Sequence, residues 1–93
     1  MIKSFKDIET EKVFEHKVVR KLPPEILRRA LVRLKAIDIA LNLADLKEPP
    51  SNRLEKLGGN RAGQHSIRIN DQWRICFQWT DFGVYDVEIT DYH

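Results

Sequence analysis

The feature that most constrains the fold is the alternation of apolar and polar residues in the last third of the chain. Apolar side chains recur at every second position in residues 65–69 and 73–79. A period of two is typical of a strand with one buried face. The three residues between these segments, Asn70–Gln72, favour a turn. The two segments are therefore expected to form a hairpin.

The register of this hairpin follows from the burial of its apolar face. A shift of one residue would turn a strand over, so both apolar rows must share a face. Ile67 then lies opposite Ile75, and Arg68 lies opposite Arg74 on the other face. Facing like charges destabilise a strand pair by roughly 0.2–1 kcal/mol. Three explanations remain open: a carboxylate between the arginines, a bare anion site, or two surface arginines that splay into water.

A further strand is expected over residues 83–89, antiparallel to residues 73–79 across a short connection. Its apolar row is Tyr85, Val87 and Ile89. Matching the apolar faces places either Thr90 or Glu88 beside Arg74. In both cases the strand ends close to the arginine pair.

The residues that follow this strand carry groups suited to proton transfer. They are Asp91, Tyr92 and His93. Histidine exchanges protons near neutral pH, and arginines suit a phosphate and the charge that develops on it. A patch that combines these groups suits the phosphodiester of a polynucleotide.

Two helices are expected before the sheet. Asp7 is a candidate N-cap for a short helix that ends near His16, with three buried side chains: Ile8, Val13 and Phe14. A longer helix should run from Pro24 to Asn42. Its apolar stripe is Leu27, Ala30, Leu31, Leu34, Ile37 and Leu41.

The other side of the long helix is basic, with Arg28, Arg29, Arg33 and Lys35. This side is either a solvated helix surface or a second surface that follows phosphates. Residues 49–63 have the composition of a loop, in which Leu54 and Leu57 should contact the core. Polar groups in or beside this loop could reach a ligand: Asn52, Arg53, Arg61 and Gln64.

The element order predicts an α+β domain over residues 1–93, with two helices packed on one face of a small, twisted, mainly antiparallel sheet. The opposite face, with Arg68 and Arg74, should be open. A net charge of +2 is too small to argue for nucleic-acid binding by itself. The single cysteine, Cys76, excludes an intramolecular disulfide and fits a reducing cytoplasm.

Membrane and metal chemistry are both disfavoured by the sequence. The N-terminal residues lack an apolar signal core, and no apolar run approaches the length of a membrane span. The histidines and Cys76 do not have the spacing of metal ligands, so neither a metal nor another cofactor is expected.

The run GNRAGQHSIRINDQWRICF, with the opening IKSF and the terminal VEITDYH, resembles the HigB toxins of the RelE/ParE superfamily, in the branch that includes GraT. This resemblance implies a RelE-like fold and the toxin of a type II toxin–antitoxin system. It also implies a HigA-like helix-turn-helix antitoxin as partner, with operator DNA contacted only through that complex. The family activity is metal-independent cleavage of messenger RNA, generally in the ribosomal A site, with the 2′-hydroxyl as nucleophile.

The resemblance assigns roles only where the positions match. Arg68 and Arg74 would hold the scissile phosphate and stabilise the transition state. His93 would act as general acid or base, and Tyr92 would stack on a base or donate a proton. Asp91 would orient His93 or an arginine, unless it only neutralises Arg74.

The sequence departs from some relatives just before the sheet. Glu55 and Gly58 stand where those relatives have a histidine and a lysine. Arg53, Arg61 and His65 are candidates to bind RNA in their place. Two alternatives to a nuclease remain open: a ParE-like toxin that inhibits a protein target, and a weakly active module that mainly binds antitoxin.

Overall fold

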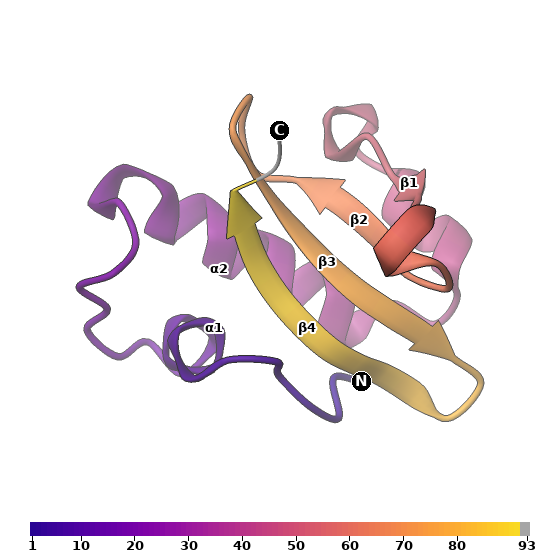
Figure 1. Cartoon of the computed structure of the whole chain (residues 1–93), viewed down its shortest axis with the longest axis horizontal. Coiled ribbons are helices and arrows are strands. Elements are labelled where there is room, and N and C mark those ends of the chain that lie inside the picture. Colours follow the sequence, from indigo (N-terminus) through magenta and orange to yellow (C-terminus); the bar gives the residue numbers. More distant parts are fainter. Residues whose placement is uncertain (92–93) are drawn as a thin grey trace.

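The computed structural model describes residues 1–91 and confirms an α+β fold with two helices on one side of an antiparallel sheet (Figure 1). The helices are α1 (Ile8–Phe14) and α2 (Pro24–Ile39). The strands, in their order across the sheet, are β1 (Glu55–Lys56), β2 (His65–Arg68), β3 (Trp73–Thr80) and β4 (Gly83–Asp91). Three 3-10 helices occupy the connection between α2 and β2: Leu43–Lys47, Pro50–Asn52 and Gly59–Arg61.

The predicted register between β2 and β3 is confirmed. Ile67 pairs with Ile75 and Arg68 pairs with Arg74. The side chain of Asn70 fixes the turn. Its oxygen accepts hydrogen bonds from Gln72 N at 2.9 Å and from Trp73 N at 2.8 Å. This use of an asparagine side chain is a common way to fix a tight turn.

Pairing between β3 and β4 shows which residue lies beside Arg74 and corrects the apolar row expected for β4. Thr90, rather than Glu88, lies beside Arg74. A register shift opposite Phe77, with Asp86 in the left-handed region (φ 55°), inserts an extra residue into β4. The expected apolar row was therefore wrong at Tyr85, because the bulge returns Val84 to the core face instead.

Helix α1 begins as predicted, with the Asp7 carboxylate accepting a hydrogen bond from Thr10 N at 2.7 Å. Val13 is buried, but the expectation for Ile8 was wrong, since this side chain is 54% exposed. Thr10 is buried in its place, and its hydroxyl oxygen accepts a hydrogen bond from Ile89 N at 2.9 Å. This contact joins α1 to β4.

Helix α2 ends at Ile39 rather than at Asn42. Asn42 instead caps the next 3-10 helix, and the Asp45 carboxylate accepts hydrogen bonds from Leu41 N and Asn42 N. This capping box starts a new element, so Leu41 is 92% exposed and leaves the predicted stripe. The buried residues of α2 are Ile26, Ala30, Leu34 and Ile37.

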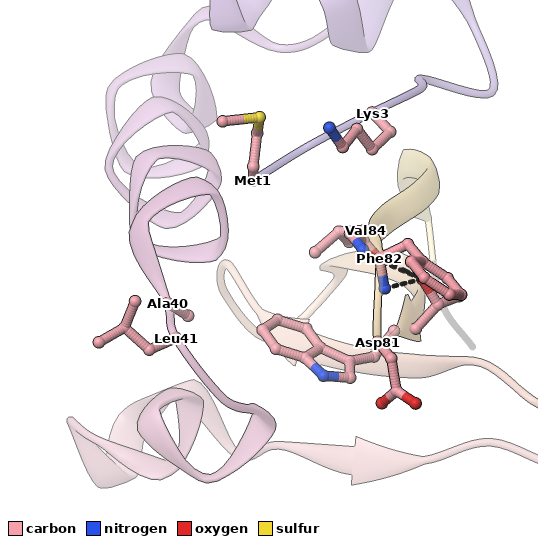
Figure 2. A pocket seen from close by; sticks show the side chains of 10 residues that line it. Met1, Lys3, Ala40, Leu41, Asp81, Phe82 and Val84 are labelled. Atoms are coloured by element: carbon pink, nitrogen blue, oxygen red, sulfur yellow. Dashed lines mark hydrogen bonds between the residues drawn. The ribbon is translucent and has the colours of Figure 1, made fainter.

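The segment before α1 runs beside β4 and forms two isolated parallel bridges with it, Ile2 with Val84 and Phe5 with Val87. Lys3 N donates to Val84 O at 2.7 Å, and Val84 N donates to Met1 O at 3.0 Å. A hollow of about 320 Å³ lies here, beside the β3–β4 turn. Figure 2 shows Met1, Leu41 and Phe82 around it.

The connection before β2 is more ordered than its composition suggested. Asn52 was expected to reach a ligand, but it is fully buried and donates to the carbonyl oxygens of Leu46 and Glu48 at 3.2 and 3.1 Å. Its side chain therefore closes the loop instead of facing outward. Among residues 1–91, no helix combines the length and the apolar character needed to cross a membrane.

Candidate functional site

A cavity of about 240 Å³ lies at the end of the sheet where β2 turns into β3. Its lining is almost entirely charged or polar: Arg53, Glu55, Arg68, Asn70, Asp71 and Arg74. The facing arginines predicted from the strand register are therefore both part of one cavity. An anionic ligand is the occupant that such a lining favours.

Arg74 is held rigidly at this cavity. Its Nε donates to Ser66 Oγ at 2.8 Å, and its Nη2 donates to the carbonyl oxygens of Arg53 and Ser66 at 2.6 and 3.3 Å. Arg74 is only 8% exposed. The alternative in which both arginines splay into water is therefore wrong for Arg74. The expected open face is partly covered here, because the Arg53 backbone packs over the guanidinium.

Each arginine has a carboxylate beside it. Glu55 Oε1 lies 3.8 Å from Arg74 Nη1, and Asp71 forms an ion pair and hydrogen bond with Arg68. The side chain of Glu55 is 50% exposed and that of Asp71 is 97% exposed. Ion pairs this open to water are weak, so an incoming phosphate can replace these carboxylates.

Glu55 is a site residue that the reasoning from residue patterns missed. It lies in β1 opposite Ser66, and this pairing brings it to the cavity. Its one signal in the sequence was its match to the loop histidine of relatives. Gly58, the other departure, precedes the third 3-10 helix and does not line the cavity.

The other RNA-binding candidates divide between the cavity and its surroundings. Arg53 lines the cavity. Arg61 lies farther along the same face, where Nη1 donates to Glu88 Oε1 at 3.0 Å and to Gln64 Oε1 at 3.2 Å. His65 pairs with Phe77, whose side chain faces the core, and thus points to the side opposite Arg74.

His65 has the surroundings of a packed residue. Its ring lies 6.4 Å from that of Phe77, centroid to centroid. Burial lowers the pKa of His65, and the positive charge of Lys56 lowers it further. Its Nδ1 is buried without a hydrogen-bond partner within residues 1–91.

The terminal residues are only partly described. Asp91 pairs with Trp73, and its Oδ2 accepts a hydrogen bond from Gln72 Nε2 at 2.9 Å. It therefore lies at the cavity end of the sheet, one position beyond the partner of Arg74. Tyr92 and His93 lie outside the described residues, so their predicted roles remain predictions.

Comparison with known sequences gives one family profile and two similar proteins. The profile of the family described as RelE-like toxin of type II toxin–antitoxin system HigB matches residues 3–93. Toxin HigB-1 of Vibrio cholerae is 43% identical over 82 residues, covering 87% of this chain and 86% of the relative. Endoribonuclease HigB of Proteus vulgaris is 37% identical over 93 residues, covering all of both chains.

A solved structure, the YoeB–YefM complex from Staphylococcus aureus, contains a chain of the same fold. The match has a TM-score of 0.62 at 19% identity and covers 100% of this chain and 98% of that one. At this identity the likeness concerns the fold alone, and it agrees with the predicted RelE-like architecture.

Proposed function

This chain belongs to the HigB family of RelE-like toxins of type II toxin–antitoxin systems, and we propose that it is an endoribonuclease that cleaves messenger RNA at the arginine cavity. The observation that carries the proposal is Arg74, buried and fixed by three hydrogen bonds opposite Arg68. A rigid guanidinium is prepared for a phosphate without reorganisation. The name of the Proteus vulgaris relative, an endoribonuclease, supports the same activity.

The reaction we infer is attack of a ribose 2′-hydroxyl on the adjacent phosphorus. The 2′-oxygen loses its proton and bonds to phosphorus, while the bond to the 5′-oxygen breaks and that oxygen gains a proton. The products are a 2′,3′-cyclic phosphate and a free 5′-hydroxyl. Arg68 and Arg74 stabilise the negative charge that builds on the phosphoryl oxygens.

Two groups are needed for the two proton transfers. Glu55 lines the cavity. Once the RNA phosphate has displaced the Glu55 carboxylate from Arg74, this carboxylate can accept the proton of the 2′-hydroxyl. His93 then protonates the leaving 5′-oxygen, and Tyr92 stacks on a base beside the cut. Asp91 orients His93. No step in this scheme requires a metal.

The partners follow from the family. As the toxin of such a system the chain has an antitoxin, which we propose to be HigA-like, with operator DNA contacted only through the complex. We further propose that the message is cut on the ribosome, at the A site, in the cytoplasm. A second solved structure of the same fold, a heterotetrameric YoeB–YefM toxin–antitoxin complex from Staphylococcus aureus, supports an antitoxin as the partner.

Primer extension on a defined message tests the proposal. The purified protein, Arg68→Ala and His93→Ala would each be added to translating ribosomes and, separately, to naked message. We expect new 5′ ends at A-site codons, reduced about 10²-fold or more by either substitution. Arg68→Ala suits this test because its ion pair with Asp71 is exposed, so the fold should survive.

Arg20→Ala, an exposed arginine that does not line the cavity, is the matched control and should cut normally. Growth arrest by the wild-type protein without any cleavage would reject the nuclease in favour of a ParE-like protein target. Cleavage of naked message would keep the nuclease and remove the ribosome from the proposal.

A further inference from the structure

Helix α2 contributes a second basic feature next to the arginine cavity. The Nε of Arg33 donates to the carbonyl oxygen of Arg68 at 3.2 Å, across 35 residues of sequence. Arg68 and Arg74 form a pair without hydrogen bonds between their backbones, because the bonds lie at the adjacent pair, Ile69 and Trp73. The carbonyl of Arg68 therefore points away from β3. Arg33 therefore sits at the outer edge of β2, directly behind a residue that lines the cavity.

Arg29 extends this feature along the helix. It lies one turn before Arg33, on the same side of α2, and is exposed. Burial lowers the pKa of the Arg33 guanidinium, and the charge of Arg29, one helical turn away, lowers it further. Among the ion pairs formed within residues 1–91, none includes Arg29 or Arg33, although Glu25 lies one turn before Arg29.

The remaining basic side chains of α2 have a different use. Lys35 Nζ lies 4.1 Å from the centre of the Phe14 ring, a cation–π contact with α1. Arg28 lines a hollow with Val13 of α1 and with His16 and Lys17, which follow that helix. The basic residues of α2 thus divide into an α1 side and a cavity side.

We propose that Arg29 and Arg33 bind the backbone phosphates of the RNA strand next to the phosphate held by Arg68 and Arg74. The proposal rests on the proposed function and adds to it a path for the strand, from the cavity across the edge of β2 onto α2. It also gives the like-charged pair a role, since uncompensated neighbouring arginines suit a polyanion.

The test measures binding without cleavage. A fluorescein-labelled RNA dodecamer with 2′-O-methyl groups lacks the nucleophile, so its anisotropy reports affinity alone. Each neutralised phosphate contributes a slope of about 0.7 to the dependence of log K on log salt for a single strand. Arg29→Gln should therefore lower the slope by about 0.7 and weaken binding about fivefold at 0.1 M salt.

Arg28→Gln is the matched control, because it removes the same charge from the neighbouring exposed position on the α1 side. It should bind nearly as wild type, and Arg29→Lys should restore affinity. Arg29 is a cleaner test than Arg33, whose loss would also release the Arg68 backbone. Equal affinity of Arg29→Gln and wild type, equal losses in both glutamine variants, or no binding by wild type would each overturn the path.

The outcome is separable from that of the nuclease test. A wild-type protein that cuts message, together with an Arg29→Gln variant that binds normally, would reject the path and keep the function. A protein that cuts nothing, but loses RNA affinity only in Arg29→Gln, would keep the path and reject the function.

Discussion

At the scale of single residues, Arg74 illustrates how a charged side chain becomes part of a fixed structure. A surface arginine loses side-chain entropy when it closes on a ligand. Arg74 has already lost that freedom in the fold, through bonds to Ser66 and to the Arg53 backbone. Arg68 remains half-exposed and paired with the exposed Asp71. The two arginines therefore differ in role: Arg74 is held in a fixed position, and Arg68 can adjust its position to the ligand.

His65 yields a prediction of pH dependence. Its pKa is lowered from the ordinary value of 6.5, mainly by burial, so the folded protein keeps the ring neutral where the unfolded chain takes up a proton. This contribution to stability is present above pH 6.5 and is lost as the pH falls below it. Urea unfolding at pH 7.5 and 5.5 should show that His65→Gln loses less unfolding free energy between the two pH values than wild type does.

The comparison between the two proteins cancels the titration of the carboxylates, which both share. Equal losses of unfolding free energy in wild type and His65→Gln would show that burial of this ring does not govern the pH response.

At the scale of elements, Thr10 connects α1 to β4 through the hydrogen bond from Ile89 N. Thr10→Val keeps the shape of the side chain but leaves a buried N–H unpaired. We expect a loss of about 1–3 kcal/mol of unfolding free energy, measured by urea denaturation. Thr10→Ser keeps the hydroxyl and should lose less. A valine variant as stable as the serine variant would contradict this account.

The elements also show what the sequence could predict and where it could not. Alternation predicted the β2–β3 register because a slip of one residue would expose Ile67 and Ile75. Alternation could not reveal the bulge at Asp86, because Tyr85, Val87 and Ile89 already form an unbroken apolar row in the sequence. The end of α2 was missed because Asn42 reads equally well as the last helical residue and as a cap.

The same reasoning applies to the site. The pattern placed Arg68 and Arg74 opposite each other, but burial of Arg74 depends on the Arg53 backbone, which a loop composition does not predict. Glu55 reaches the cavity only through its pairing with Ser66, a two-residue strand without periodicity. His65 alternates with Ser66 and therefore could have been assigned to the core side from the register alone.

At the scale of the whole molecule, β3 separates two hollows. The arginine cavity lies at one end of β3, and the hollow of Figure 2 lies at the other, beside Gly83. Eight residues of strand at about 3.3 Å each span roughly 26 Å. A local change at the Gly83 end should therefore alter stability without altering cleavage.

Gly83→Ala tests this separation. Gly83 has φ +150°, and an added Cβ would lie 2.5 Å from Lys3 Cγ and 3.1 Å from Met1 O. We expect a loss of roughly 1–3 kcal/mol in urea unfolding, with the cleavage rate of the folded protein unchanged. Gly58→Ala, with φ −125° and open space around the new Cβ, should change stability little. Similar losses in both variants would reject the explanation.

The attachment of the first residues to the last strand has a consequence for synthesis. Ser4 Oγ accepts a hydrogen bond from Asp86 N, and Thr10 accepts one from Ile89 N, contacts that span 82 and 79 residues. A nascent chain presents Ser4 and Thr10 long before their partners exist. Contacts this distant in sequence form late, so α1 cannot dock while β4 is still being translated. A chain that stops before β4 would therefore lack the strand against which Ser4 and Thr10 pack, and the complete fold can form only after β4 has been translated.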